Sequence, residues 1–205
     1  PASSNPRTRK HRNALLMKKQ IHDFDDYSEF MTKQLRSLRH FERCLFSVWC
    51  ADRLLASHAD LLEENLSEQD LRTSQVIVND LWDSLLGDMI PEKDQLNALD
   101  MDFMGNSDEW SAPMREIHPI ASIVKQSVGM CIVCCRRNDV GLAQTIAQLV
   151  MDSIEYNLEE NDPSSSPNTL FEHPQIQHKL EAQLAMVKHL RGEYELDSRL
   201  RMMFL

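Results

Sequence analysis

Glycine and proline are scarce in this sequence, which has five glycines and eight prolines among its 205 residues. A β-rich fold needs many tight turns, and turns rely on these two residue types, so their scarcity favours long helices. Uninterrupted apolar runs are also short, and none approaches the roughly 20 residues that a membrane-spanning helix requires. We therefore expect an all-α protein of one domain, a bundle of six to eight helices without a membrane segment.

Signatures of the common enzyme classes are absent. The sequence contains no G-x-G-x-x-G, no phosphate-binding P-loop and no G-x-S-x-G, which argues against the enzymes that depend on these motifs. No Asp or Glu is followed three residues later by His, so the di-iron pattern of helical bundles is missing as well. The eight histidines are scattered along the chain. We therefore expect no cofactor and no metal site, and catalysis is not the leading hypothesis.

The five cysteines are an odd number, and they fall inside apolar segments. A secreted disulfide framework usually has an even count, so we expect reduced thiols in the cytoplasm. Cys131 and Cys135 continue the apolar stripe of a helix predicted over residues 119–137, and Cys134 lies at the edge of that stripe. A redox C-x-x-C has its attacking thiol at a helix N-terminus, whereas this pair lies near a C-terminus. The pattern favours buried thiols over a metal or redox site.

Charge is distributed unevenly along the chain. Residues 1–22 contain six basic residues and no acidic one, so they contribute +6 to the net charge of -10, and residues 23–205 carry -16. We interpret residues 1–22 as a basic tail, either solvated, or ahead of the natural start, or an arm for nucleic acid or a partner. Residues 23–205 form a single helical domain, whose acidity argues against nucleic-acid binding and suits a basic protein partner or self-association.

Apolar residues recur every three or four positions through most of the domain, which is the period of amphipathic helices. Polar segments with proline or glycine separate these helices. The predicted helices cover residues 41–64, 67–87, 91–99, 119–137, 140–160 and 174–192, and the predicted loops cover residues 100–113 and 161–168.

Several polar positions have a predicted place on these helices. Ser67 and Asp70 have the spacing of a capping box at the start of the helix over 67–87. Lys125 falls opposite the apolar stripe of its helix, so we expect it on the polar side. Arg136 and Arg137 follow the last cysteines, and we interpret both as caps of the helix C-terminus.

One acidic residue breaks the apolar pattern of its helix. Asp52 follows Val48 by four positions and precedes Leu55 by three, so it lies inside the apolar stripe. A buried charge without a partner is costly, so we expect a donor on a neighbouring segment. Arg53 is a poor candidate for that donor because consecutive helical residues point about 100° apart. Asp52 is therefore half of a structural ion pair, a ligand-binding acid with a shifted pKa, or a residue at the rim of a bent helix.

Two further residues are candidate binding residues. Trp110 lies in the predicted loop over 100–113, where it would serve as a surface anchor. His118 directly precedes Pro119, where it would cap the following helix. Isolated tryptophan and histidine residues more often simply pack against their neighbours. Together with Asp52 they complete the candidate site residues, and we assign no residue a catalytic role.

Three segments resemble one bacterial family: FERCLFSVWCADRLLASHADLLEE (41–64), VNDLWDSLLG (78–87) and IPEKDQLNALD (90–100). Their order and spacing are similar to the YjaG-like family, also called domain of unknown function 416. Asp52 and Arg53 match an acid–Arg pair of that family, and residues 82–85 match a Trp-acid-hydroxyl-Leu step. The resemblance covers about residues 40–195 and implies an all-helical cytoplasmic domain without established catalytic residues. Ser122 stands where relatives carry an acid, so the resemblance implies no acidic site there.

Two classes of function are compatible with these observations. The leading hypothesis is a non-catalytic interaction protein that acts through an acidic surface or by self-association, which requires an exposed patch. The runner-up is a small-molecule-binding or enzymatic bundle built around Asp52, which requires a pocket beside that residue. A third hypothesis, that the chain inhibits a basic toxin, rests on charge alone.

Overall fold

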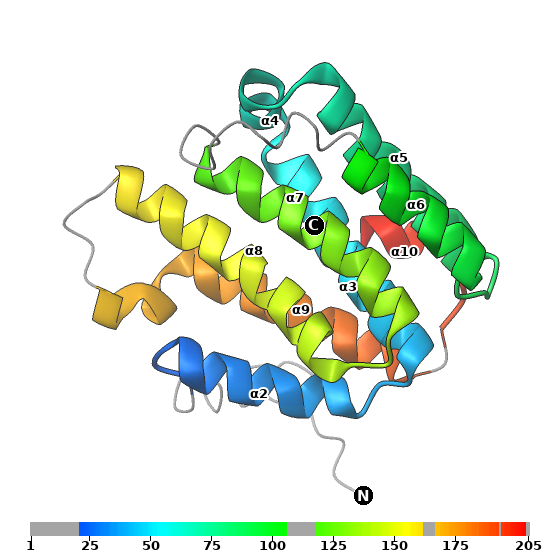
Figure 1. Ribbon diagram of the computed structural model, residues 1–205. Coiled ribbons are helices and arrows are strands. Elements are labelled where there is room, and N and C mark those ends of the chain that lie inside the picture. The colour runs from blue at the N-terminus through cyan, green and yellow to red at the C-terminus, as the bar shows by residue number, and fades with distance from the viewer. Residues whose placement is uncertain (1–20, 106–117, 162–166, 193, 204–205) are drawn as a thin grey trace, which may run out of the picture.

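The computed structural model describes residues 21–105, 118–161, 167–192 and 194–203. Within these ranges the chain forms nine α-helices and one short 3-10 helix, η2, with no strand (Figure 1). The predicted all-α class is therefore confirmed. The elements are α2 (Phe24–Arg36), α3 (His40–Ser57), α4 (Ala59–Asn65), α5 (Glu68–Leu86), α6 (Lys93–Gly105), α7 (Pro119–Arg136), α8 (Val140–Asn161), η2 (Pro167–Glu172), α9 (Pro174–Leu190) and α10 (Ser198–Met202).

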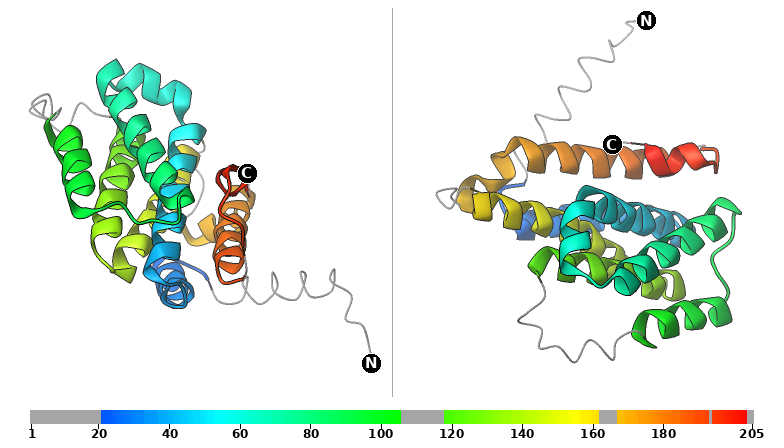
Figure 2. Two further views of the ribbon diagram at one scale, coloured as in Figure 1. Left: turned by 90° about the vertical axis from the view of Figure 1, so that its right-hand side faces the viewer. Right: turned by 90° about the horizontal axis from the view of Figure 1, so that it is seen from above.

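Helix α3 is the centre of the bundle. It packs against α5, α7, α8 and α9, and every residue from Glu42 to Leu55 is buried. Helices α9 and α10 lie on one side of α3, and α7 and then α6 lie on the other (Figure 2). A helix that is buried all round is normally apolar all round. The polar residues of α3 must therefore find partners inside the protein.

Two helices begin at the caps that the sequence predicts. The Ser67 hydroxyl accepts a hydrogen bond from the backbone N–H of Asp70 at 3.0 Å at the start of α5. The Asp70 carboxylate accepts from the same hydroxyl at 3.0 Å, so the capping box is not reciprocal. His118 caps α7, because its Nδ1 accepts from the backbone N–H of Ile120 at 3.2 Å. The prediction that His118 is a helix cap is therefore confirmed.

Several boundaries differ from those that the sequence predicts. The helix predicted over 41–64 is interrupted at His58, whose backbone (φ -122°, ψ 22°) leaves the helical region and separates α3 from α4. Helix α6 continues through Gly105, because Leu96 and Phe103 are both buried on the face that meets α7. Ile21 is buried in the core, so the packed domain begins before residue 23. Helices α2 and α10 lie outside the predicted set.

Helix α7 is long and apolar enough, by length and composition, to cross a membrane, and here it packs against α3, α6 and α8. The prediction that Lys125 lies on a polar side is wrong. Lys125 is 6% exposed, and its Nζ lies 3.0 Å from Oδ1 of Asp70 on α5, which covers that side of α7. The interpretation of the two arginines as C-terminal caps agrees with Arg137, which is the C-cap residue of α7 and whose backbone N–H donates to the carbonyl of Val133 at 2.8 Å, but it is wrong for Arg136. Its Nη2 donates to the carbonyl of Leu96 at 3.3 Å and to Asp100 at 3.1 Å, so it joins α7 to α6.

Candidate functional site

The buried carboxylate of Asp52 is held by two arginines. Asp52 lies on α3 and is 6% exposed. Arg201, on α10, donates to it twice, from Nε to Oδ2 at 3.0 Å and from Nη2 to Oδ1 at 2.6 Å. Arg53 donates from Nη2 to Oδ2 at 3.1 Å. A guanidinium that meets a carboxylate through two parallel bonds is the strong, geometrically specific form of ion pair, and Asp52 accordingly raises the pKa of Arg201.

The same face of α3 also binds the backbone of the C-terminal segment. Nη2 of Arg53 donates to the carbonyl of Arg201 at 2.7 Å. Nε1 of Trp49 donates to the carbonyl of Met203 at 3.1 Å. Trp49, Asp52 and Arg53 are spaced so that they share one side of α3, and we call these three residues the α3 clasp. The clasp binds one arginine side chain and two backbone carbonyls.

This geometry decides between the alternatives for the burial of Asp52. The expectation of a buried carboxylate with a donor on a neighbouring segment is confirmed, and the donor is Arg201. The expectation that Arg53 is a poor donor is wrong, because its long side chain reaches back along α3 to the neighbouring carboxylate. The alternative of a carboxylate exposed at a helix rim is wrong as well.

The other two candidate residues do not join Asp52. His118 is half-buried at the start of α7, where its ring contacts the ring of Tyr156 edge-on with centroids 5.5 Å apart. None of the hydrogen bonds and ring contacts among the described residues connects His118 to Asp52. Trp110 lies outside the residues that the structure describes. His118 therefore has a structural role as a helix cap. Of the three clasp residues, the sequence pattern identifies Asp52 as a candidate site residue, but not Trp49 or Arg53.

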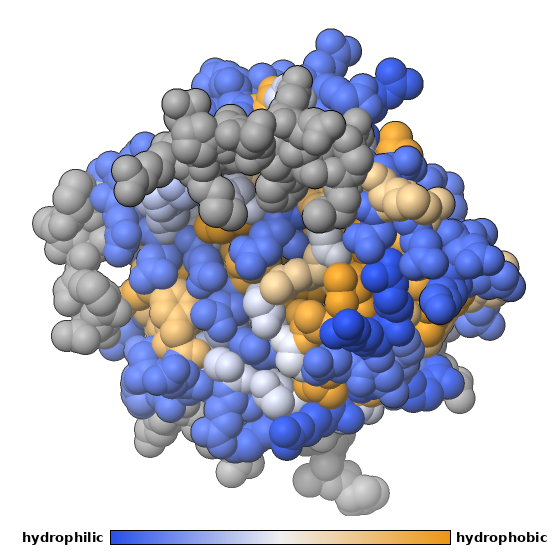
Figure 3. All heavy atoms as spheres, viewed as in Figure 1, coloured by the Kyte–Doolittle hydropathy of each residue, from blue (hydrophilic) through white to orange (hydrophobic). Residues whose placement is uncertain are grey.

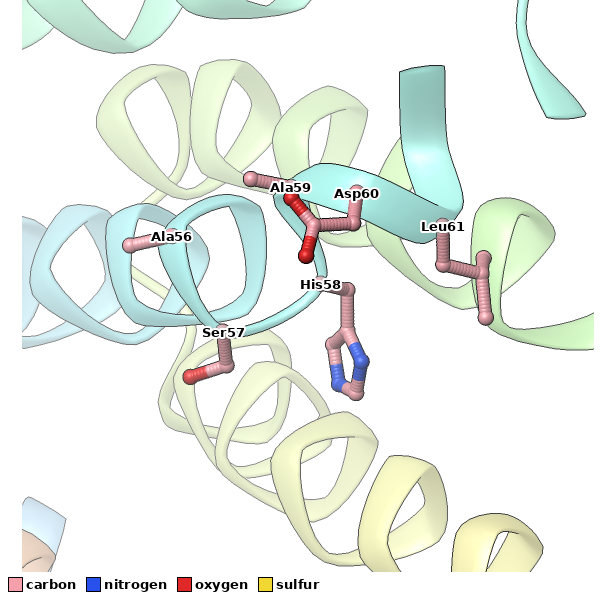
Figure 4. A pocket seen from close by; sticks show the side chains of 6 residues that line it. All are labelled: Ala56, Ser57, His58, Ala59, Asp60 and Leu61. Carbon is pink, nitrogen blue, oxygen red and sulfur yellow. The ribbon is translucent and has the colours of Figure 1, made fainter. Parts of the chain in front are cut away.

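A pocket of about 230 Å³ lies where α3 ends and α4 begins (Figure 4). Ser57, His58 and Asp60 line it, and these residue types also form nucleophilic triads. A triad requires hydrogen bonds between its members, and none of the hydrogen bonds found among the described residues joins these three side chains. Burial, with help from the nearby charges of Lys179 and His118, lowers the pKa of His58. The pocket therefore lacks an assembled nucleophile, and Asp52 is not among its lining residues.

The cysteines have the character of core residues. All five are buried free thiols, as the sequence predicts for Cys131 and Cys135. The Cys131 thiol donates to the carbonyl of Ser47 at 3.3 Å, between α7 and α3. Burial raises the pKa of Cys50 and of Cys131, the opposite of what an activated thiolate needs. Within the described part of the chain, no group of three or more His, Cys, Asp or Glu side chains is arranged to hold a metal ion.

Four exposed carboxylates lie around the junction of α4 and α5, and we call them the acidic corner: Asp60, Glu63, Glu64 and Glu68. No lysine or arginine occurs between residues 54 and 71. None of these four carboxylates forms an ion pair with a described residue. Hydrophilic side chains cover the upper edge of the molecule in Figure 3, where Figure 1 shows α4 and α5. The corner is therefore a group of exposed carboxylates without a counter-ion among the described residues.

Comparison with known proteins finds no matching family model, no matching curated protein and no matching solved structure. The resemblance to the YjaG-like family therefore stays a prediction from the sequence.

Proposed function

We propose that the chain is a non-catalytic interaction protein of the cytoplasm, which binds a basic protein partner through its acidic corner. The observation that carries the proposal is the set of four exposed carboxylates without a counter-ion among the described residues. Asp60 lies three and four positions before Glu63 and Glu64 on the seven-residue helix α4, and like charges at these spacings repel. A basic surface placed against the corner would relieve that repulsion and be steered toward it by the field.

Self-association is the weaker form of the proposal. Residues 23–205 carry a net charge of -16, so two copies repel each other at low salt. The exposed large apolar side chains of the described residues are spread over different elements: Val76, Met89, Met101 and Met202. In Figure 3 the apolar areas on the visible face are interrupted by hydrophilic side chains. An apolar dimer interface normally needs a contiguous patch.

No observation favours the alternative of an enzyme or a small-molecule receptor built around Asp52. Both carboxylate oxygens already accept hydrogen bonds, from Arg201 and from Arg53. The pocket at the end of α3 is lined by residues 56–61. A general acid or base must reach the proton that it transfers, and two guanidinium groups engage this carboxylate while α10 is docked.

The test compares the natural chain with two variants of equal charge. The corner variant replaces the acidic corner by the corresponding amides. The control variant replaces four other exposed carboxylates by glutamine, namely Glu159, Glu160, Glu172 and Glu181. Each chain is tagged in its native host, and co-purifying proteins and metabolites are identified by mass spectrometry at low and at high salt.

We expect the natural chain and the control variant to recover the same basic protein, and the corner variant to lose it. Recovery should also fall as the salt concentration rises, because exposed charges are screened within about 8 Å at physiological ionic strength. Equal recovery by all three chains would show that the corner is not the binding surface. Recovery of a metabolite in place of a protein would favour the small-molecule alternative.

A further inference from the structure

We infer that the α3 clasp is a receptor for an arginine-bearing peptide segment, occupied in cis by the chain's own C-terminal residues and available to a partner's arginine when they leave. The inference rests on the proposed function in one respect, because it takes the partner to be a basic protein. It names a second surface for that partner, the side of α3 that α10 covers.

The clasp recognises chemical groups that every arginine-bearing peptide offers. Asp52 accepts both bonds of a guanidinium fork, and Arg53 binds the carbonyl of the same residue, Arg201. Trp49 binds the carbonyl two residues further on, at Met203. One side chain and two main-chain carbonyls in fixed register define a peptide site, since the carbonyls set the direction and the fork selects arginine. Lysine would not satisfy the fork, because an ammonium group is a point charge.

The segment that occupies the clasp in cis is held by these polar contacts and by a small apolar anchor, in which Leu200 is buried and Leu196 and Met203 pack partly buried against the core. Helix α10 has five residues, and a helix this short is not stable without its docking site. Leu200 is its buried residue, whereas Met202 is 59% exposed. When α10 leaves, water can solvate the carboxylate, the guanidinium and the indole N–H of the clasp. Opening therefore exposes less apolar surface than the loss of a core helix, which places α10 among the elements that open locally.

One buried donor of the clasp has no acceptor among the described residues, as is also the case for Nε of Arg43 and Nε of Arg136. Nε of Arg53 is buried, and it has no hydrogen-bond acceptor among the described residues. The side chain of Arg53 is 9% exposed, so water does not readily serve that donor. A buried donor without an acceptor is unfavourable. A partner segment that brings a carbonyl to this nitrogen would add a hydrogen bond that residues 198–203 do not make.

Helix α9 has its own anchor, so α10 can leave without it. Arg191, at the end of α9, donates from Nε to the Ser37 hydroxyl at 2.5 Å and from Nη2 to the carbonyl of Gln34 at 2.7 Å. These bonds tie the end of α9 to α2. Residue 191 is thus fixed to α2, and the clasp separately holds residues 201 and 203. Helices α9 and α10 lie on the same side of the bundle in Figure 2.

The experiment uses the full chain and a labelled synthetic peptide with the sequence of residues 194–203. Fluorescence anisotropy measures binding of this peptide to the natural chain and to Arg201→Gln, which releases the clasp. Arg199→Gln is the matched control, because among the described residues Arg199 pairs within its own segment, with Glu195 and Asp197. A second peptide carries glutamine in place of the arginine that corresponds to position 201.

We expect the Arg201→Gln chain to bind the arginine peptide about tenfold more tightly, or better, than the natural chain, since a site that is mostly occupied in cis lowers the apparent affinity. The Arg199→Gln chain should behave like the natural one. Adding Asp52→Asn to Arg201→Gln should abolish the gain, and the glutamine peptide should not bind. Equal affinity for natural and Arg201→Gln chains, or for both peptides, overturns the inference. So does an Arg201-dependent dimer in light scattering, because the occupant in trans would then be a second copy.

Hydrogen exchange on the natural chain keeps the inference testable if Arg201→Gln does not fold. The amides of Leu200 and Met203 are hydrogen-bonded within the C-terminal segment. We expect them to exchange about a hundredfold faster than the amides of α3, and faster still with excess arginine peptide. Protection equal to that of α3 overturns the inference. The corner variant of the previous experiment should bind the peptide normally, so failure here and failure of the proposed function are distinguishable.

Discussion

Replacing Asp52 by asparagine tests how much the clasp stabilises the fold. The asparagine keeps one acceptor oxygen, but it removes the negative charge. Its NH₂ group is a donor and would face a guanidinium, which is also a donor. Two of the three hydrogen bonds to the carboxylate come from Arg201, and a bond to a charged group contributes about 1.5–3 kcal/mol. The Arg201 side chain is 35% exposed and can be hydrated, whereas Arg53 is 9% exposed and loses its counter-charge. We therefore expect Asp52→Asn to lower the free energy of unfolding by about 2–4 kcal/mol, slightly below a fully buried pair.

Urea denaturation followed by circular dichroism measures this change, with the m-value as a check that the unfolding reaction is the same. Asp80→Asn is the control, because Asp80 is an exposed carboxylate on α5, and it should change stability by less than about 0.5 kcal/mol. A loss below about 1 kcal/mol for Asp52→Asn would contradict a structural clasp. A gain in stability would instead indicate an acid retained for binding, since functional sites are often stabilised by mutation.

Three further changes test the interior. Cys131→Ser should cost about 1–3 kcal/mol in urea denaturation, because a hydroxyl enters an apolar site even though Ser47 can still accept its proton. Lys125→Met should destabilise more than the double variant Lys125→Met/Asp70→Leu, because the single change leaves a largely buried carboxylate unpaired. Burial raises the pKa of Asp152 to about 6, so the contribution of this side chain to stability should fall as pH rises from about 4 to about 6. Thermal melts of Asp152→Asn should accordingly show a gain at pH 8 that disappears below about pH 4, and a gain equal at all pH values would contradict this cause.

The sequence predicts the long helices because their apolar residues repeat with one period over many turns. Helices α5, α7, α8 and α9 begin and end close to the predicted residues. The interruption at His58 is different, because the break has neither glycine nor proline to mark it. The five residues of α10 are too few to show the hydrophobic period of a helix, so the sequence does not predict this helix and only the structure reveals it.

The partners of the buried charges could not be predicted from the pattern of a single helix. Asp52 was placed in an apolar stripe, which is enough to predict burial and a partner. Its partner Arg201 is 149 positions away, and no local pattern connects the two. Lys125 was assigned to the polar side of α7, because a helical wheel does not reveal how many neighbours surround a helix. Arg43 is a similar case. Its place in a fully buried stretch of α3 implies that it has a partner, but the sequence does not identify that partner.

Arginines tie helix ends together at more than one place in this protein, and the apolar surface beside each tie decides whether it can open. Arg43 is 6% exposed and donates to the carbonyl of Leu35 in the last turn of α2 and to that of Leu38 just after the helix. That helix has thirteen residues and buries three large side chains, so its removal would expose an apolar face to water. The clasp makes the same kind of bond to the carbonyl of Arg201, but α10 buries only one side chain. When a segment leaves, its hydrogen bonds are replaced by bonds to water at small net cost in free energy. Apolar surface that becomes exposed to water has no such replacement. Arg43 and the clasp therefore make the same kind of hydrogen bond to backbone carbonyls. We expect the contacts of Arg43 to persist in the folded protein, whereas the clasp can release α10 and bind another segment.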